Sequence, residues 1–196
     1  MQMSYFKKIE YEIVPEESFS VIRNCSGCGK KTAFKNTKRF RVNANGNKLD
    51  VWLIYQCEHC KHTFNLTIYE RQNPTSVPQN EYNLFLNNDE QFAEMYGRNL
   101  HFFKKNKAEI DFQNINYHYI KQQEITDTNA CTKSVWIIIH NPYSLKIRPE
   151  KQISEVLGLS RSHVKKMMEQ EQIQLDSISV QCISIRINEN AIGQLQ

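Results

Sequence analysis

Four cysteines, arranged in two pairs, constrain the fold of this chain more than any other feature. Cys25 and Cys28 form one C-x2-C pair and Cys57 and Cys60 form a second, with residues 29–56 between them. Two such pairs can present four thiolates to one tetrahedral Zn²⁺, with Zn–S distances near ~2.3 Å. Because four cysteine ligands leave no position for water, the predicted zinc is structural rather than catalytic.

The residues around the two pairs predict strands. Polar and apolar residues alternate on both sides of an Asn- and Gly-rich turn at 43–47, which predicts a β-hairpin that carries the second pair to the first. A further strand is expected over 62–71, and a lead-in strand ends at Pro15. We therefore predict an antiparallel zinc ribbon over 1–71. His59 and His62 lie beside the second pair, and with four cysteines present we expect them near the metal or facing solvent rather than binding it.

Composition narrows the class of protein. Hydrophobic residues make up 40% of the chain, as in globular proteins, and the formal net charge is only +4. We find no apolar core with a small-residue cleavage site near the N-terminus and no apolar run of the ~18–20 residues that a membrane span needs. The expected location is the cytoplasm, where metal thiolates are favoured over disulfides.

The middle of the chain, 72–145, follows a linker with two prolines. Apolar and aromatic residues recur at helical spacing over 79–108, which predicts two or three short helices, one of them capped by Asn88 or Asp89. The segments 115–125 and 133–140 predict two strands that pair as a β-hairpin.

The last segment, 146–196, predicts two short helices followed by strands. Gly158 can end the first helix in a left-handed conformation, and Ser160 can cap the second. Val164, Met167 and Met168 are expected to form the buried face of the second helix. The predicted fold class is thus α+β: a zinc ribbon over 1–71, short helices and a β-hairpin over 72–145, and a C-terminal module of two helices plus strands over 146–196.

Residues 157–170 resemble two nucleic-acid-binding families. They are similar to the small RNA-binding module first seen in a small-subunit ribosomal protein, although Glu171 stands where that family usually has glycine. Residues 153–168 also resemble a DNA-binding helix-turn-helix, with its turn glycine at Gly158. The whole chain resembles an uncharacterised bacterial family, domain-of-unknown-function family 1062, through the two cysteine pairs, the hairpin and residues 157–166. That resemblance implies a zinc ribbon joined to a basic C-terminal module and brings no established activity.

Basic residues suggest where a partner would bind. Between Arg23 and Arg41 the chain has seven basic residues and no acidic one, which is either a solvated face or a phosphate-binding surface. We predict nucleic-acid binding, with RNA favoured over DNA, through Arg161, His163, Lys165 and Lys166 on a helix and through Lys38, Arg39 and Arg41 on the ribbon, with Phe40 available for stacking.

Two alternatives stay open at this point. One is a transcription regulator that binds DNA through a helix-turn-helix, and the other is a non-catalytic protein-interaction module. We find no catalytic motif, no evident small-molecule substrate and no membrane partner, so an enzyme is not expected.

Overall fold

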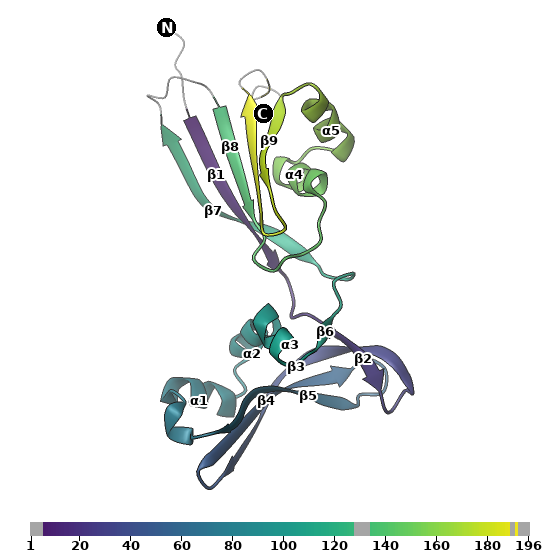
Figure 1. Cartoon of the computed structure of the whole chain (residues 1–196), viewed down its shortest axis with the longest axis vertical. Coiled ribbons are helices and arrows are strands. Elements are labelled where there is room, and N and C mark those ends of the chain that lie inside the picture. The colour runs from purple at the N-terminus through teal and green to yellow at the C-terminus, as the bar shows by residue number, and fades with distance from the viewer. Residues whose placement is uncertain (1–5, 128–133, 189–190, 192–196) are drawn as a thin grey trace. The chain divides into compact units, whose positions relative to one another are not determined.

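The chain folds into two units, each built on its own five-stranded sheet (Figure 1). The computed structural model describes residues 6–127, 134–188 and 191. One unit comprises Pro15–Asn116, and the other combines Met1–Val14 with Tyr117–Gln196. We call the first the ribbon unit and the second the mixed-sheet unit. The ribbon unit is therefore inserted into the mixed-sheet unit, after its first strand.

The ribbon unit has the strand order β5-β4-β3-β2-β6, and all of its neighbouring strands run antiparallel. The predicted hairpin is confirmed, because the last pair before its turn joins Asn45 to Lys48 and Gly46 takes a φ of +58°. A bulge lies between Asn36 and Phe40 of this hairpin. The strands are β2 (Val21–Cys25), β3 (Lys30–Asn45), β4 (Lys48–Cys57), β5 (Thr63–Gln72) and β6 (Glu109–Ile110).

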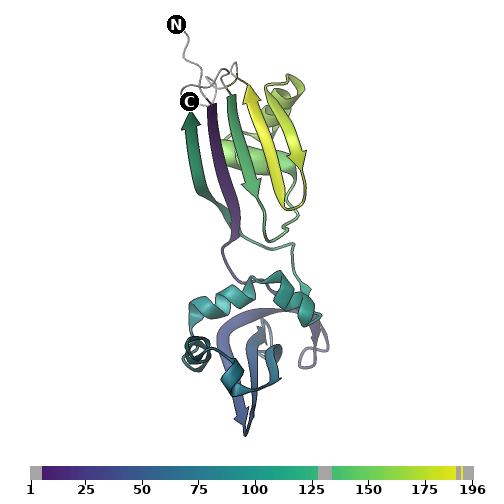
Figure 2. The same ribbon diagram turned by 60° about the vertical axis from the view of Figure 1, so that its left-hand side comes forward.

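Three short helices cover one face of this sheet (Figure 2), where the sequence predicted two or three helices. Asp89 is the capping residue of the second, since its carboxylate accepts from the Phe92 amide at 2.8 Å. Phe85 packs edge-on against Phe40 of β3 with ring centres 5.0 Å apart, which fixes these helices over the hairpin. They are α1 (Gln79–Leu86), α2 (Glu90–Gly97) and α3 (Leu100–Lys105), and a 3₁₀ turn, η1 (Pro74–Ser76), precedes them.

The mixed-sheet unit has the strand order β7-β1-β8-β10-β9. β1 lies parallel to β8, while β8, β10 and β9 are antiparallel neighbours. Two helices, α4 (Pro149–Leu157) and α5 (Arg161–Glu169), lie on one face of the sheet (Figure 2). The strands are β1 (Phe6–Pro15), β7 (Tyr117–Asp127), β8 (Ser134–His140), β9 (Ile173–Ile178) and β10 (Cys182–Asn188).

This sheet corrects the predicted fold class. The expected central hairpin is wrong, because β1 lies between β7 and β8. The expected C-terminal module of two helices plus strands is also wrong. α4 and α5 instead cover a sheet that draws strands from the start, middle and end of the chain. The physical reason is long-range strand pairing: β1 pairs with one edge of β8 and β10 with the other, so neither edge of this apolar strand is left exposed.

The unit boundaries, at 14/15 and 116/117, do not coincide with the boundaries predicted at 71/72 and 145/146. Cys131 lies outside the described residues. Among the described residues, no helix is long and apolar enough to cross a membrane.

Candidate metal centre

The four predicted cysteines meet at one end of the ribbon sheet. Cys25 is the last residue of β2 and Cys57 is the last residue of β4, so pairing through β3 brings their turns together. The Sγ atoms of Cys25 and Cys60 lie 3.3 Å apart and those of Cys28 and Cys57 lie 3.8 Å apart. All four sulfurs lie within 4.8 Å of one another.

The two cysteine turns have the same backbone design. The Gly29 amide donates to the Cys25 carbonyl at 2.8 Å, and the Lys61 amide donates to the Cys57 carbonyl at 3.2 Å. Gly29 and Lys61 both take positive φ, at 68° and 63°. Each turn therefore closes on a left-handed residue directly after its second cysteine, which is glycine in the first turn and lysine in the second.

Gly27 allows the two turns to approach. A Cβ atom at this position would lie 2.8 Å from Cys60 Sγ, closer than two such atoms can pack. The sequence prediction missed this role, although a glycine inside the first C-x2-C pair is a signal for a close approach. His62 is not one of the four clustered residues. It links the two turns by a hydrogen bond, with its Nε2 3.0 Å from Ser26 Oγ.

The four thiols have different surroundings. Cys25 and Cys57 are buried, Cys28 is half-buried and Cys60 is exposed. The Thr32 hydroxyl lies 3.3 Å from Cys57 Sγ, and this hydrogen bond lowers the pKa of Cys57 to about 6. Hydrogen bonding to Cys60, together with burial, raises the pKa of Cys28 to about 12. No local sequence signal marks Thr32, because it reaches Cys57 only through the pairing of β3 with β4.

This arrangement fits a tetrahedral metal ion. Four sulfurs at ~2.3 Å from a central ion lie about 3.8 Å from one another, and the observed spacings bracket that value. One thiol ionises readily while another holds its proton, so a bound cation must displace protons. The four cysteines can therefore hold a metal ion, more weakly as the pH falls.

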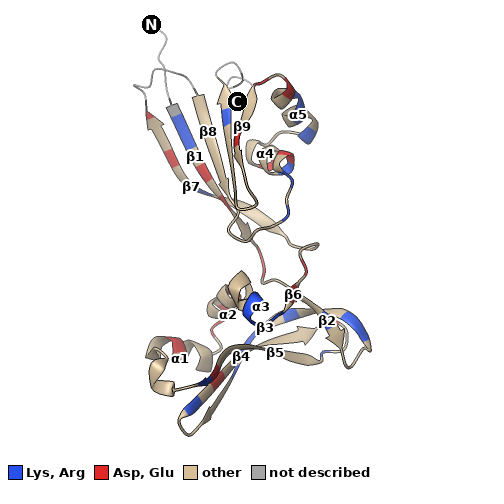
Figure 3. Ribbon diagram, viewed as in Figure 1, with Lys and Arg blue, Asp and Glu red and all other residues tan. Residues whose placement is uncertain are grey.

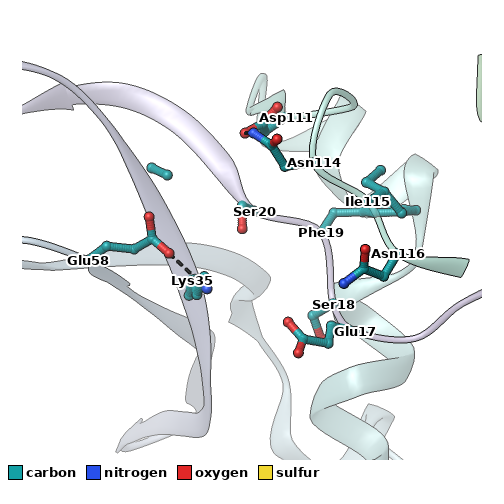
Figure 4. A pocket seen from close by; sticks show the side chains of 11 residues that line it. Glu17, Ser18, Phe19, Ser20, Lys35, Glu58, Asp111, Asn114, Ile115 and Asn116 are labelled. Carbon is teal, nitrogen blue, oxygen red and sulfur yellow. Dashed lines mark hydrogen bonds and ion pairs between the residues drawn. The ribbon is translucent and has the colours of Figure 1, made fainter.

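Two hollows lie on either side of Glu58, the residue that follows Cys57. One is a pocket of about 300 Å³ whose lining includes Glu17, Ser20, Asp111 and Asn116 (Figure 4). The other is an open groove of about 710 Å³ that reaches Cys57. Lys35 and Glu58 line both hollows, and an ion pair of 2.8 Å joins them.

The basic residues predicted on the ribbon differ in how free they are. Lys38 contacts two carboxylates of α2, Glu94 at 2.8 Å and Glu90 at 3.3 Å, so its charge is neutralised. Arg39 is exposed. The guanidinium of Arg41, also exposed, lies 5.9 Å from the ring centre of Trp52.

Phe40, by contrast, is only 6% exposed and packs against Phe85. The expectation that Phe40 is available for stacking on a base is wrong.

The basic residues predicted on the C-terminal helix lie on α5 in the mixed-sheet unit (Figure 3). Val164 and Met167 are buried, and the four predicted residues on the other side of the helix are exposed: Arg161, His163, Lys165 and Lys166. Gly158 ends α4 with a φ of 67°, and Ser160 caps α5 by accepting from the His163 amide at 3.2 Å. Both of these predictions are confirmed. The predicted contact residues thus lie in two different units.

Comparison with known proteins gives one match. The family model of DUF1062, described as a protein of unknown function, matches residues 42–179. Searches of curated proteins and of solved structures found no match.

Proposed function

The chain belongs to the DUF1062 family of proteins of unknown function, and we propose that it is a nucleic-acid-binding protein held together by one structural Zn²⁺. Zinc is the metal that four cysteines in two C-x2-C pairs bind most often in a structural role. The ligands are Cys25, Cys28, Cys57 and Cys60, which span the ends of two strands and so join segments that are far apart in sequence.

The exposed basic side of α5 carries the proposal of nucleic-acid binding. Arg161, Lys165 and Lys166 stand at i, i+4 and i+5, within little more than one helical turn. Of these three residues, Lys165 alone has a carboxylate partner within the described part of the chain. That partner is Glu169, the contact is 4.0 Å long, and both side chains are largely exposed. A pair of this kind contributes little, so these cations remain available to phosphates.

RNA is favoured over DNA because of what surrounds α5. A helix-turn-helix that reads a major groove usually packs its pair of helices against a third helix and acts as a dimer. In the mixed-sheet unit, α4 and α5 pack instead on one face of a five-stranded sheet. Docking of a basic helix onto the phosphates of structured RNA needs no such framework.

A salt titration tests the proposal. In the variant R161Q/K165Q/K166Q we expect weaker binding to every structured RNA tested, and a log–log salt slope that flattens by roughly 0.7–0.9 per lost contact. The matched control K48Q/K104Q/K107Q removes the same charge from exposed lysines of the ribbon unit and should retain both affinity and slope. Equal affinities and slopes in wild type and the α5 variant would contradict the role of α5.

A further inference from the structure

The open groove beside the metal centre has a surface that the proposed function does not use. It lies on the face of the ribbon sheet opposite the helices, because Val51, Leu53 and Tyr55 point inward and are 0% exposed. The alternate residues Ile54 and Gln56 line the groove. Trp52 continues the same face along β4 and is half-buried.

The groove is positively charged. Its lining includes Lys35, Arg39 and Lys61 but only one acid, Glu58. Glu58 pairs with Lys35, the contact drawn as a dashed line in Figure 4. Among the described residues, neither Arg39 nor Lys61 has a carboxylate partner. Lys61 donates instead to the Glu58 carbonyl at 3.2 Å.

The floor of the groove is suited to flat, partly apolar groups. Ile54 supplies an apolar surface. The Thr37 hydroxyl donates to the Ile54 carbonyl at 2.8 Å and the Gln56 amide donates to the Lys61 carbonyl at 3.1 Å, so both side chains can offer a ligand their oxygens as acceptors.

Further along β4, the Arg41 guanidinium lies 5.9 Å from the centre of the Trp52 ring. A guanidinium and an aromatic ring placed side by side offer a base a surface on which to stack.

We propose that this groove binds single-stranded nucleic acid, with phosphates on Arg39 and Lys61 and bases against Ile54 and Trp52. A base in a duplex is stacked on both faces, so only an unpaired base can lie against the sheet. The two cations without carboxylate partners complement a phosphate chain, and the open groove suits a continuous strand. This inference rests on the proposed function in one respect, that the ligand is nucleic acid. The groove itself lies in the ribbon unit, whereas α5 belongs to the mixed-sheet unit.

The second cysteine turn positions one of the two cations. Lys61 directly follows Cys60, and the positive φ that closes the second cysteine turn sets the direction of its side chain. We therefore expect removal of the metal to weaken binding of a single strand in the groove.

Trp52 is a local reporter for the test. The chain has two tryptophans, and the other, Trp136, lies on β8 in the mixed-sheet unit. In the full-length variant W136F, titration with a 12-residue oligouridine should quench Trp52 fluorescence. Adding R39Q/K61Q should reduce affinity by about 25-fold at 0.1 M salt and flatten the salt slope by about 1.4, because two contacts to a single strand are lost.

The control K104Q/K107Q, in the same background, removes two exposed lysines that do not line the groove and should leave the titration unchanged. The R161Q/K165Q/K166Q variant should retain Trp52 quenching even if it loses structured RNA, which separates failure of this inference from failure of the proposed function. Equal affinity for R39Q/K61Q and its parent would overturn the inference. So would quenching by polyglutamate in place of oligouridine, since that would assign the groove to an acidic protein partner.

Discussion

At the scale of single residues, the four cysteines are not equivalent. Cys57 is fully buried and accepts a hydrogen bond from Thr32, so it is the thiol most ready to ionise. Cys60 is exposed. Replacing Cys57 would remove a packed sulfur as well as a candidate metal ligand, whereas replacing Cys60 would remove mainly a candidate ligand.

We expect Cys57→Ser to abolish retention of the single zinc and to unfold the ribbon unit, because the free energy of metal binding contributes to folding. Cys60→Ser should also lose zinc while remaining soluble enough to purify. Elemental analysis after gel filtration measures both. Cys182→Ser is the control, since Cys182 lies on β10 outside the cluster, and it should keep one zinc per chain. Full zinc content in both cluster variants, or iron in place of zinc in the wild type, would contradict the assignment.

At the scale of the element, α5 depends on its first turn. Ser160 accepts from the His163 amide at 3.2 Å and follows the left-handed Gly158. We expect Ser160→Ala to lower the free energy of unfolding of the mixed-sheet unit by about 0.5–2 kcal/mol. Ser160→Asp, which can cap the helix in the same way, should restore most of that loss. Chemical denaturation followed by Trp136 fluorescence measures both, and an unchanged midpoint for Ser160→Ala would contradict the capping role.

Helices and hairpins whose boundaries depend on residues close together in the sequence could be predicted. The pairing of strands that are far apart in the sequence could not. The β3–β4 hairpin follows from its alternation and its Asn-Gly turn, and the ends of α4 and α5 follow from Gly158 and Ser160. The pairing of β1 with β8 joins Ile9 to Ile137, and no local pattern marks which of several strands fills that place.

The same limit applies to the candidate sites. The spacing of the cysteines marks the metal ligands directly. The charge on Lys38 is neutralised by Glu90 and Glu94, which α2 brings across from a distant part of the sequence. A cluster of basic residues therefore overestimates the free positive surface.

At the scale of the whole molecule, each unit has its own sheet and its own buried side chains. The four clustered cysteines lie entirely in the ribbon unit, so the free energy of binding a metal ion there would stabilise that unit. Structural zinc supplies about 10–16 kcal/mol in zinc-finger peptides at neutral pH, which is as large as the whole stability of a typical domain. The mixed-sheet unit receives none of this directly.

We therefore expect two unfolding transitions, only one of which depends on metal. In W136F, where Trp52 reports the ribbon unit, a strong zinc chelator should greatly lower or abolish the transition, and added zinc should restore it. In W52F, where Trp136 reports the mixed-sheet unit, the same chelator should leave the midpoint unchanged. The ribbon unit is inserted after β1, so its unfolding leaves the ends of β1 and β7 joined by a long loop, and the cost of a longer loop grows only slowly with length. A transition that shifts equally in both variants would show that the two units unfold as one.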